Sequence, residues 1–100
     1  MSGFYRFPAM AMFREYDSKD QLEYIQGEAI EAFQQYARWK FAVQQDLSYG
    51  KVNGERIAYG LEIMDVIHAA ETALRIEFSD DEISMMRDAV EAKNRRRGYY

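Results

Sequence analysis

Two acidic pairs with the same spacing lie inside two long segments that are otherwise rich in apolar residues. Glu28 and Glu31 form the first pair, and Glu62 and Asp65 form the second. Residues three apart on an α-helix share one face, with their Cβ atoms about 5–6 Å apart. Two such helices packed antiparallel would bring four carboxylates together, and like charges repel unless a cation lies between them. Hard cations such as Mg²⁺ prefer oxygen ligands, so the four acids predict a divalent-metal site.

The spacing of apolar residues predicts helices and gives no strand signal of comparable strength. Ser18 and Gln21 fit a capping box, so we expect the first helix to run from there to about Asp46 or Leu47. Residues 48–54 contain two Gly and one Asn and predict a loop. The apolar stripe of the first helix comprises Leu22, Ile25, Ala29, Ala32, Phe33, Tyr36, Trp39 and Val43.

The second helix is expected from about Gly54 to Phe78, and Glu62 and Asp65 project between two apolar arcs on it. One arc comprises Ile57, Leu61, Met64, His68 and Thr72, and the other comprises Ile63, Val66, Ile67, Ala70 and Leu74. A helix that is apolar on most sides is buried on most sides, and a chain of 100 residues buries only a modest core. The predicted fold is therefore all-α, an antiparallel helical bundle completed by dimerisation, as a homodimer or a homotetramer built as a dimer of dimers.

The third helix is expected to begin after Ser79, which forms a capping box with Glu82. It should end at about Asn94 or Arg96, because basic residues favour the last turn of a helix and Gly98 follows. Residues 1–17 are interpreted as an N-terminal arm that contains a short helix from Pro8 to Glu15. Residues 18–100 are interpreted as one helical domain.

Composition excludes several classes of function. The formal net charge of −4 gives no general attraction to nucleic acid, and without Cys there is no disulfide framework or thiolate nucleophile. No apolar stretch approaches the roughly 20 residues that a membrane span needs. We therefore expect no nucleic-acid partner, no membrane association and a cytoplasmic location.

The order of these motifs resembles that of the MazG-like all-α nucleoside triphosphate pyrophosphohydrolases. That family combines an E-x-x-E helix, an E-x-x-D helix and a C-terminal helix that ends in a Lys-Asn stretch followed by basic and aromatic residues. The corresponding segments are 28–31, 62–65 and 93–100, which read EAIE, EIMD and KNRRRGYY. The resemblance covers residues 18–100. Gly27 and Leu61 stand where the family often has a further acid, which reduces the charge around the four core acids.

The resemblance implies hydrolysis of a nucleoside or deoxynucleoside triphosphate to the monophosphate and pyrophosphate, in control of the nucleotide pool. It implies Mg²⁺, with Mn²⁺ as a substitute, bound by Glu28, Glu31, Glu62 and Asp65. By analogy, Glu28 or Glu31 is the carboxylate that takes a proton from the attacking water.

The basic C-terminal run supplies candidate phosphate ligands, since residual phosphate charge must meet donors other than the carboxylates. Lys93, Asn94 and Arg97 are the predicted substrate-binding residues, and Lys51 is a weaker candidate. The alternative is that a basic helix end only complements the helix dipole.

Simpler interpretations stay open for the other residues. Acidic pairs three apart are common as solvated charges on a helix face, and His68 and the aromatic residues of the first stripe are more typical of a core than of a ligand site. The alternative function is a catalytically silent helical module that binds a nucleotide or a protein.

Overall fold

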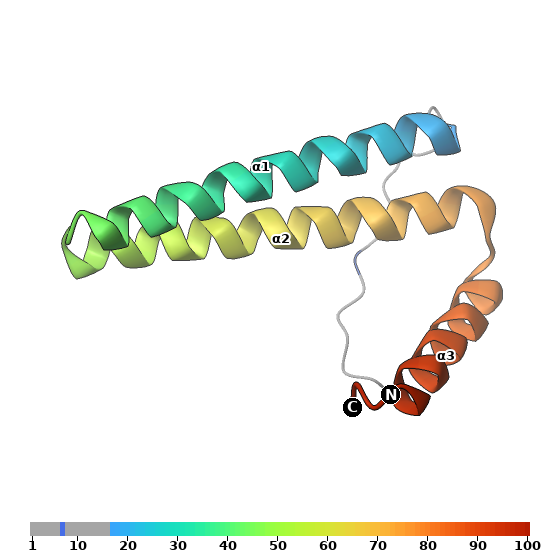
Figure 1. The fold of residues 1–100 in the computed structure, drawn as a ribbon. Coiled ribbons are helices and arrows are strands. Elements are labelled where there is room, and N and C mark those ends of the chain that lie inside the picture. The colour runs from blue at the N-terminus through green and yellow to red at the C-terminus, as the bar shows by residue number, and fades with distance from the viewer. Residues whose placement is uncertain (1–6, 8–16) are drawn as a thin grey trace.

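The computed structural model describes Phe7 and residues 17–100, and this part of the chain contains helices and no strand. The helices are α1 (Ser18–Gln44), α2 (Tyr49–Glu77) and α3 (Asp80–Arg96). Figure 1 shows α1 and α2 side by side and antiparallel, with α3 turning away from the end of α2. The predicted all-α class is confirmed. The predicted short helix from Pro8 to Glu15 lies outside the described residues.

None of the helices in the described ranges has an apolar stretch long enough to cross a membrane.

The start of α1 differs from the prediction by one residue. Asp17 is the N-cap, and its side chain accepts a hydrogen bond of 2.7 Å from the Asp20 backbone N–H. Gln21 does not complete a capping box, because its side-chain amide donates to the Ala69 carbonyl of α2 at 3.0 Å. Ser18 lies inside the helix, and its hydroxyl donates to the Glu77 carboxylate. Ser18 and Gln21, which the sequence suggested as a local cap, therefore connect α1 to α2.

The turn between α1 and α2 is shorter than predicted. The Asp46 N–H bonds to Val43 O at 3.1 Å and the Leu47 N–H bonds to Ala42 O at 3.2 Å, an arrangement that closes a helix end. Asp46 takes the left-handed conformation that this closure requires, with φ of 52°. Ser48 then caps α2 by accepting from the Lys51 N–H.

The prediction of a loop over residues 48–54 was therefore wrong, since α2 begins at Tyr49 and contains both glycines. Glycine lowers helix propensity by about 1 kcal/mol, but tertiary packing routinely overrides propensity. Here the side chain of Gln35 on α1 donates to the Glu55 carbonyl on α2 at 3.1 Å, and this contact lies in the turns next to the two glycines.

Polar side chains, rather than the predicted apolar stripe, line much of the seam between α1 and α2. The buried residues of α1 are Gln21, Ala32, Gln35 and Ala42. Leu22 and Phe33, predicted to be core residues, are 57% and 78% exposed. Ala32 of the predicted stripe is buried and Ile25 and Trp39 are half-buried, while its other members are exposed in the single chain.

Few apolar side chains are buried within one chain. Among the described residues, the buried hydrophobic ones are Ala32, Ala42, Ala69 and Ile83. Both arcs of α2 include exposed members, with Leu61 at 62% and Ile63 at 37%. Contact between α3 and α2 is slight, in keeping with the way α3 points away from the helix pair in Figure 1.

Helix α3 begins and ends as predicted. Ser79 and Glu82 form the capping box, with the Ser79 N–H donating to Glu82 Oε1 at 2.9 Å and the Glu82 N–H donating to Ser79 Oγ at 3.2 Å. These bonds to Ser79 lower the pKa of the Glu82 carboxyl. Gly98 follows the last turn with φ of 76°, a conformation that favours glycine.

Replacing Ser79 by Ala should loosen the first turn of α3. Loss of an N-cap costs about 1 kcal/mol, so the amides of Glu82 and Ile83, which both bond to Ser79, should exchange with solvent about five-fold faster in hydrogen-exchange measurements. Ser84→Ala is the matched control, because Ser84 is exposed within the helix and Ala is the better helix former. Equal exchange rates in wild type and Ser79→Ala would show that the capping box does not hold this turn.

Candidate metal centre

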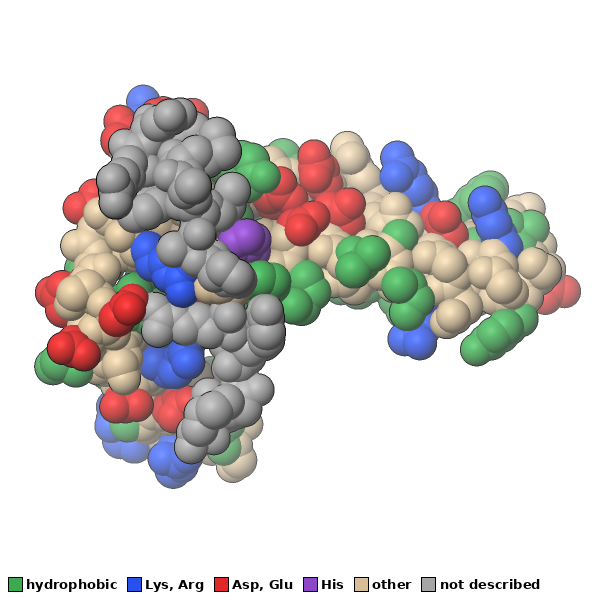
Figure 2. Space-filling view, turned by 180° about the vertical axis from the view of Figure 1, so that it is seen from behind, with side chains coloured by type: hydrophobic (Ala, Val, Ile, Leu, Met, Phe, Trp, Pro, Cys, Tyr) green, Lys and Arg blue, Asp and Glu red, His purple; other side chains and the backbone are tan. Residues whose placement is uncertain are grey.

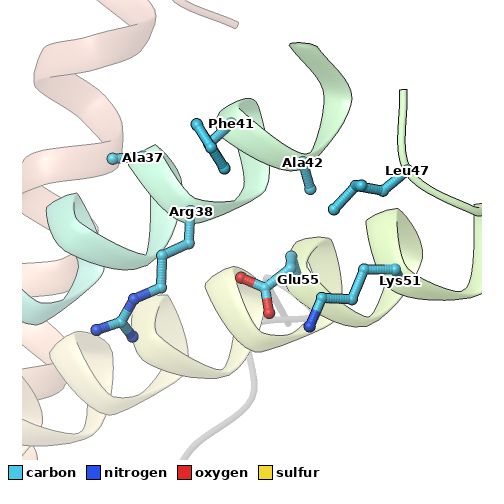
Figure 3. Close-up of a pocket in the computed structure, with 7 residues that line it drawn as sticks. All are labelled: Ala37, Arg38, Phe41, Ala42, Leu47, Lys51 and Glu55. Atoms are coloured by element: carbon cyan, nitrogen blue, oxygen red, sulfur yellow. The ribbon is translucent and has the colours of Figure 1, made fainter. Parts of the chain in front are cut away.

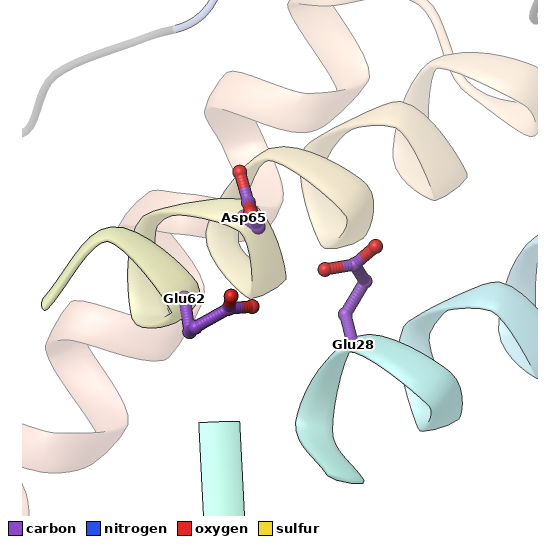
Figure 4. A group of neighbouring side chains, drawn as sticks. All are labelled: Glu28, Glu62 and Asp65. Carbon is purple, nitrogen blue, oxygen red and sulfur yellow. The ribbon is translucent and has the colours of Figure 1, made fainter. Parts of the chain in front are cut away.

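Three of the four predicted acids come together between α1 and α2. Glu28, Glu62 and Asp65 each offer a carboxylate oxygen, and these atoms lie within 4.8 Å of one another. Figure 4 shows Glu28 extending from α1 and Glu62 from α2, with their carboxylates directed toward each other across the gap between the helices. A separation of this size brings oxygens from two helices within reach of one divalent cation.

Two oxygens of this group are buried and have no hydrogen-bond partner, namely Glu28 Oε2 and Glu62 Oε2. A buried carboxylate oxygen without a donor is costly, because it loses its hydration and gains nothing in return. Asp65 is exposed, so one side of the group is open to solvent. The orphaned oxygens and the open side together fit a cation that enters from solvent and coordinates both helices.

Glu31 lies outside this compact group. Its side chain is exposed on α1, yet its charge acts on both Glu62 and Tyr24. The predicted convergence of four acids therefore holds for three at close range, with Glu31 next to them. Glu31 shares a face of α1 with Glu28 and is the acidic neighbour that raises the pKa of Glu62 most, so it lies at the edge of the group.

The pKa of the Glu62 carboxyl is raised above its ordinary value of 4.5, and burial is the largest cause. The neighbouring carboxylates raise it further, in the order Glu31, Asp65, Glu28. The guanidinium of Arg38 acts in the opposite direction. The folded chain thus holds the Glu62 proton more tightly than the unfolded chain does.

Tyr24 belongs to the site although the sequence did not single it out. A hydrogen bond to the Glu28 carboxylate is the largest cause of its raised pKa, followed by burial and the charges of Glu28, Asp65 and Glu31. Tyr24 precedes Glu28 by one helical turn, and that spacing is the sequence signal that could have identified it. The Tyr24 hydroxyl therefore lies beside the Glu28 carboxylate.

The predicted phosphate ligands at the C-terminal end lie apart from the acids of their own chain. Lys93 and Arg97 are exposed and Asn94 is half-buried, all at the last turn of α3. Figure 1 shows this end of α3 well away from the middle of the α1–α2 pair. Within one chain, these three residues are therefore not brought to the group formed by Glu28, Glu62 and Asp65.

His68 and the aromatic residues of α1 make ring contacts. The Phe7 ring stacks on the His68 ring, with centroids 4.5 Å apart, and His68 Nε2 is buried without a hydrogen-bond partner. Trp39 stacks on Tyr59 at 5.7 Å, and Lys40 Nζ lies 4.0 Å from the centroid of the Trp39 ring. The three-carboxylate group includes neither His68 nor any aromatic residue.

No protein-family model matches the chain, and neither a curated protein nor a solved structure matches it.

The stability of the metal-free protein should fall as pH rises through the raised pKa of Glu62. Below about pH 4.5 the folded and unfolded chains both hold this proton, and above the raised pKa the folded chain bears the full cost of the charge. Glu62→Gln should remove this part of the pH dependence and stabilise the metal-free protein near neutral pH. Urea unfolding in EDTA from about pH 4 to about pH 8 measures this pH dependence of the free energy of unfolding. Glu23→Gln, an exposed change on α1, should leave the slope as in wild type, and an unchanged slope in Glu62→Gln would contradict the assignment.

Mg²⁺ or Mn²⁺ should raise the melting temperature by mass action. A cation at roughly 100 times its Kd adds about 2.7 kcal/mol to the stability of the folded state. Asp65→Asn should weaken the cation affinity at least about ten-fold, or ~1.4 kcal/mol, because a charged ligand is lost. Thermal unfolding with increasing Mg²⁺ gives the comparison, with Asp88→Asn on α3 as the matched control. Equal affinities in Asp65→Asn and wild type would show that Asp65 is not a ligand.

Proposed function

We propose that this protein is a Mg²⁺-dependent nucleoside triphosphate pyrophosphohydrolase. The observation that carries the proposal is the group formed by Glu28, Glu62 and Asp65, with two buried oxygens that lack a donor. Repelling carboxylates are costly to fold together, and a bound cation offsets that cost. The order of the acidic and basic motifs, with its resemblance to the MazG-like family, supplies the reaction class.

The proposed reaction breaks the P–O bond between the α- and β-phosphates and adds one water molecule. Bound Mg²⁺ would neutralise phosphate charge and lower the pKa of water. Glu28, Glu62 and Asp65 would hold the cation. Glu31 is the better candidate for the general base, because it lies beside this group and is exposed, so its carboxylate is free to accept the proton.

A second chain fits the proposal as well. The side of the helix pair that carries Phe33, Tyr36 and Tyr59 includes an apolar hollow of about 400 Å³. Covering this surface would give the chain the core that its few buried residues do not provide. Because the last turn of α3 lies away from its own acids, Lys93, Asn94 and Arg97 would bind the phosphates held by a partner chain.

Pyrophosphate release from a panel of nucleoside and deoxynucleoside triphosphates tests the activity. We expect turnover with Mg²⁺ or Mn²⁺ and none with EDTA. Glu31→Gln should lower kcat by about 10²–10⁴-fold, the usual contribution of a general base, while Mn²⁺ affinity stays close to that of wild type. Glu23→Gln on the same helix should keep normal kcat. Metal binding without turnover of any triphosphate would favour the silent binding module instead.

Sedimentation at micromolar concentration tests whether a second chain binds. We expect a dimer or a tetramer, and Phe33→Asp should shift it toward monomer because a charge would enter the apolar contact. Tyr49→Asp is the control, since Tyr49 is 83% exposed at the start of α2 and away from this hollow. A monodisperse wild-type monomer would remove dimerisation from the proposal.

A further inference from the structure

A second hollow, of about 570 Å³, lies between α1 and α2 near the turn that joins them. It is lined by Ala37, Arg38, Phe41, Ala42, Leu47, Lys51 and Glu55. Figure 3 shows Arg38 extending from α1, and Lys51 and Glu55 extending from α2. Its charged groups are two cations and one carboxylate, set among apolar walls. Arg38 and Lys51 are both exposed, so an anion could reach them from solvent.

The negative group of this hollow already has a partner. Glu55 Oε2 accepts a hydrogen bond of 3.2 Å from the Gln35 side-chain amide, and Gln35 Oε1 accepts one of 3.3 Å from Arg38 Nη1. Neither Arg38 nor Lys51 forms an ion pair with any described residue. A guanidinium carries several N–H donors, so the single bond to Gln35 leaves Arg38 with donors to spare. The hollow therefore holds surplus positive charge and unused donors.

The hollow lies nearer to the α1–α2 turn than the acidic group does. Arg38 follows Glu31 by seven residues, which is two turns of α1 and about 10 Å along its axis. On α2, Lys51, Glu55 and Glu62 are spaced by four and seven residues, which places them on one stripe.

The charge of Arg38 also acts on Glu62. Figure 2 shows acidic side chains gathered near the middle of the helix pair, with basic side chains beside them toward the α1–α2 turn. Arg38 is therefore the cation of the hollow that lies toward the acids, whereas Lys51 precedes Glu62 by eleven residues, about 16 Å along α2.

We propose that Arg38 and Lys51 form an anion-binding site for the pyrophosphate end of the substrate. The proposal rests on the proposed hydrolysis, in which the leaving pyrophosphate carries most of the negative charge. Arg38 would bind phosphate oxygens through its forked N–H groups, and Lys51 would act as a point charge on the side of the hollow toward the α1–α2 turn. A sugar and base are uncharged and give two cations nothing to neutralise, which favours the pyrophosphate end over the nucleoside end.

Calorimetric titration with inorganic pyrophosphate in the presence of Mg²⁺ tests the site, using the full chain. The double variant Arg38→Ala/Lys51→Ala should weaken pyrophosphate binding at least about ten-fold. Its affinity for Mn²⁺ alone should be unchanged or slightly higher, because removing Arg38 takes a positive charge away from Glu62. Weaker pyrophosphate binding with retained Mn²⁺ affinity excludes a general loss of folding, which would weaken the binding of both ligands.

The matched control is Lys40→Ala/Arg56→Ala, which removes the same charge outside the hollow. Lys40 lies over the Trp39 ring and Arg56 Nε donates to Asn53. If the control weakens pyrophosphate binding as much as the double variant, only net charge matters and the site is overturned. Unchanged binding in the double variant, or no binding by wild type, also overturns it.

Failure of the proposed hydrolysis would look different. A wild type that releases no pyrophosphate from any triphosphate, but binds pyrophosphate through Arg38 and Lys51, would retain the anion site and lose the enzyme activity. A wild type that hydrolyses triphosphates, with pyrophosphate affinity independent of both residues, would retain the activity and lose the anion site.

Discussion

Carboxylates in the seam between α1 and α2 oppose the helix packing that brings them together. Glu28 and Glu62 each bury an oxygen with no donor, and the pKa of Glu62 is raised by burial and by its acidic neighbours. Hydrogen bonds between the two helices lie on either side of these acids. Gln21 and Gln35 donate to carbonyls of α2 on either side of the acids, and small residues such as Ala32 let the two backbones approach. A divalent cation would turn the repulsion at the centre into a bond between the helices.

The same arrangement explains why so little of the chain is core. Because polar residues occupy the seam, apolar side chains such as Phe33 and Leu61 are displaced to the outer sides of the helix pair. The acids lie near the middle of the helix pair, and Arg38 and Lys51 line a hollow toward the turn. Stability, assembly and chemistry would then be coupled, with the cation closing the seam and a second chain covering the apolar surface.

Sequence reasoning predicted the helical class, the capped start of α3 and the close approach of three of the acids, because each depends on local spacing. Residues three apart share a helix face whatever the helix packs against. It failed at residues 48–54, where glycine and asparagine predicted a loop and packing against α1 extended the helix instead. It also placed Phe33 in a core, since periodicity identifies an apolar face without saying what covers it. Arg38 was missed because its role depends on the approach of α2, and no spacing within α1 reveals it.

The most direct test of the metal-bridged seam is anomalous diffraction from crystals grown with Mn²⁺. A bound cation should appear as a peak within about 2.5 Å of carboxylate oxygens from both helices, with Glu28 on one side and Glu62 and Asp65 on the other. The contradicting result is the absence of a peak between these residues at saturating Mn²⁺. In that case the two helices would pack without a bridging metal.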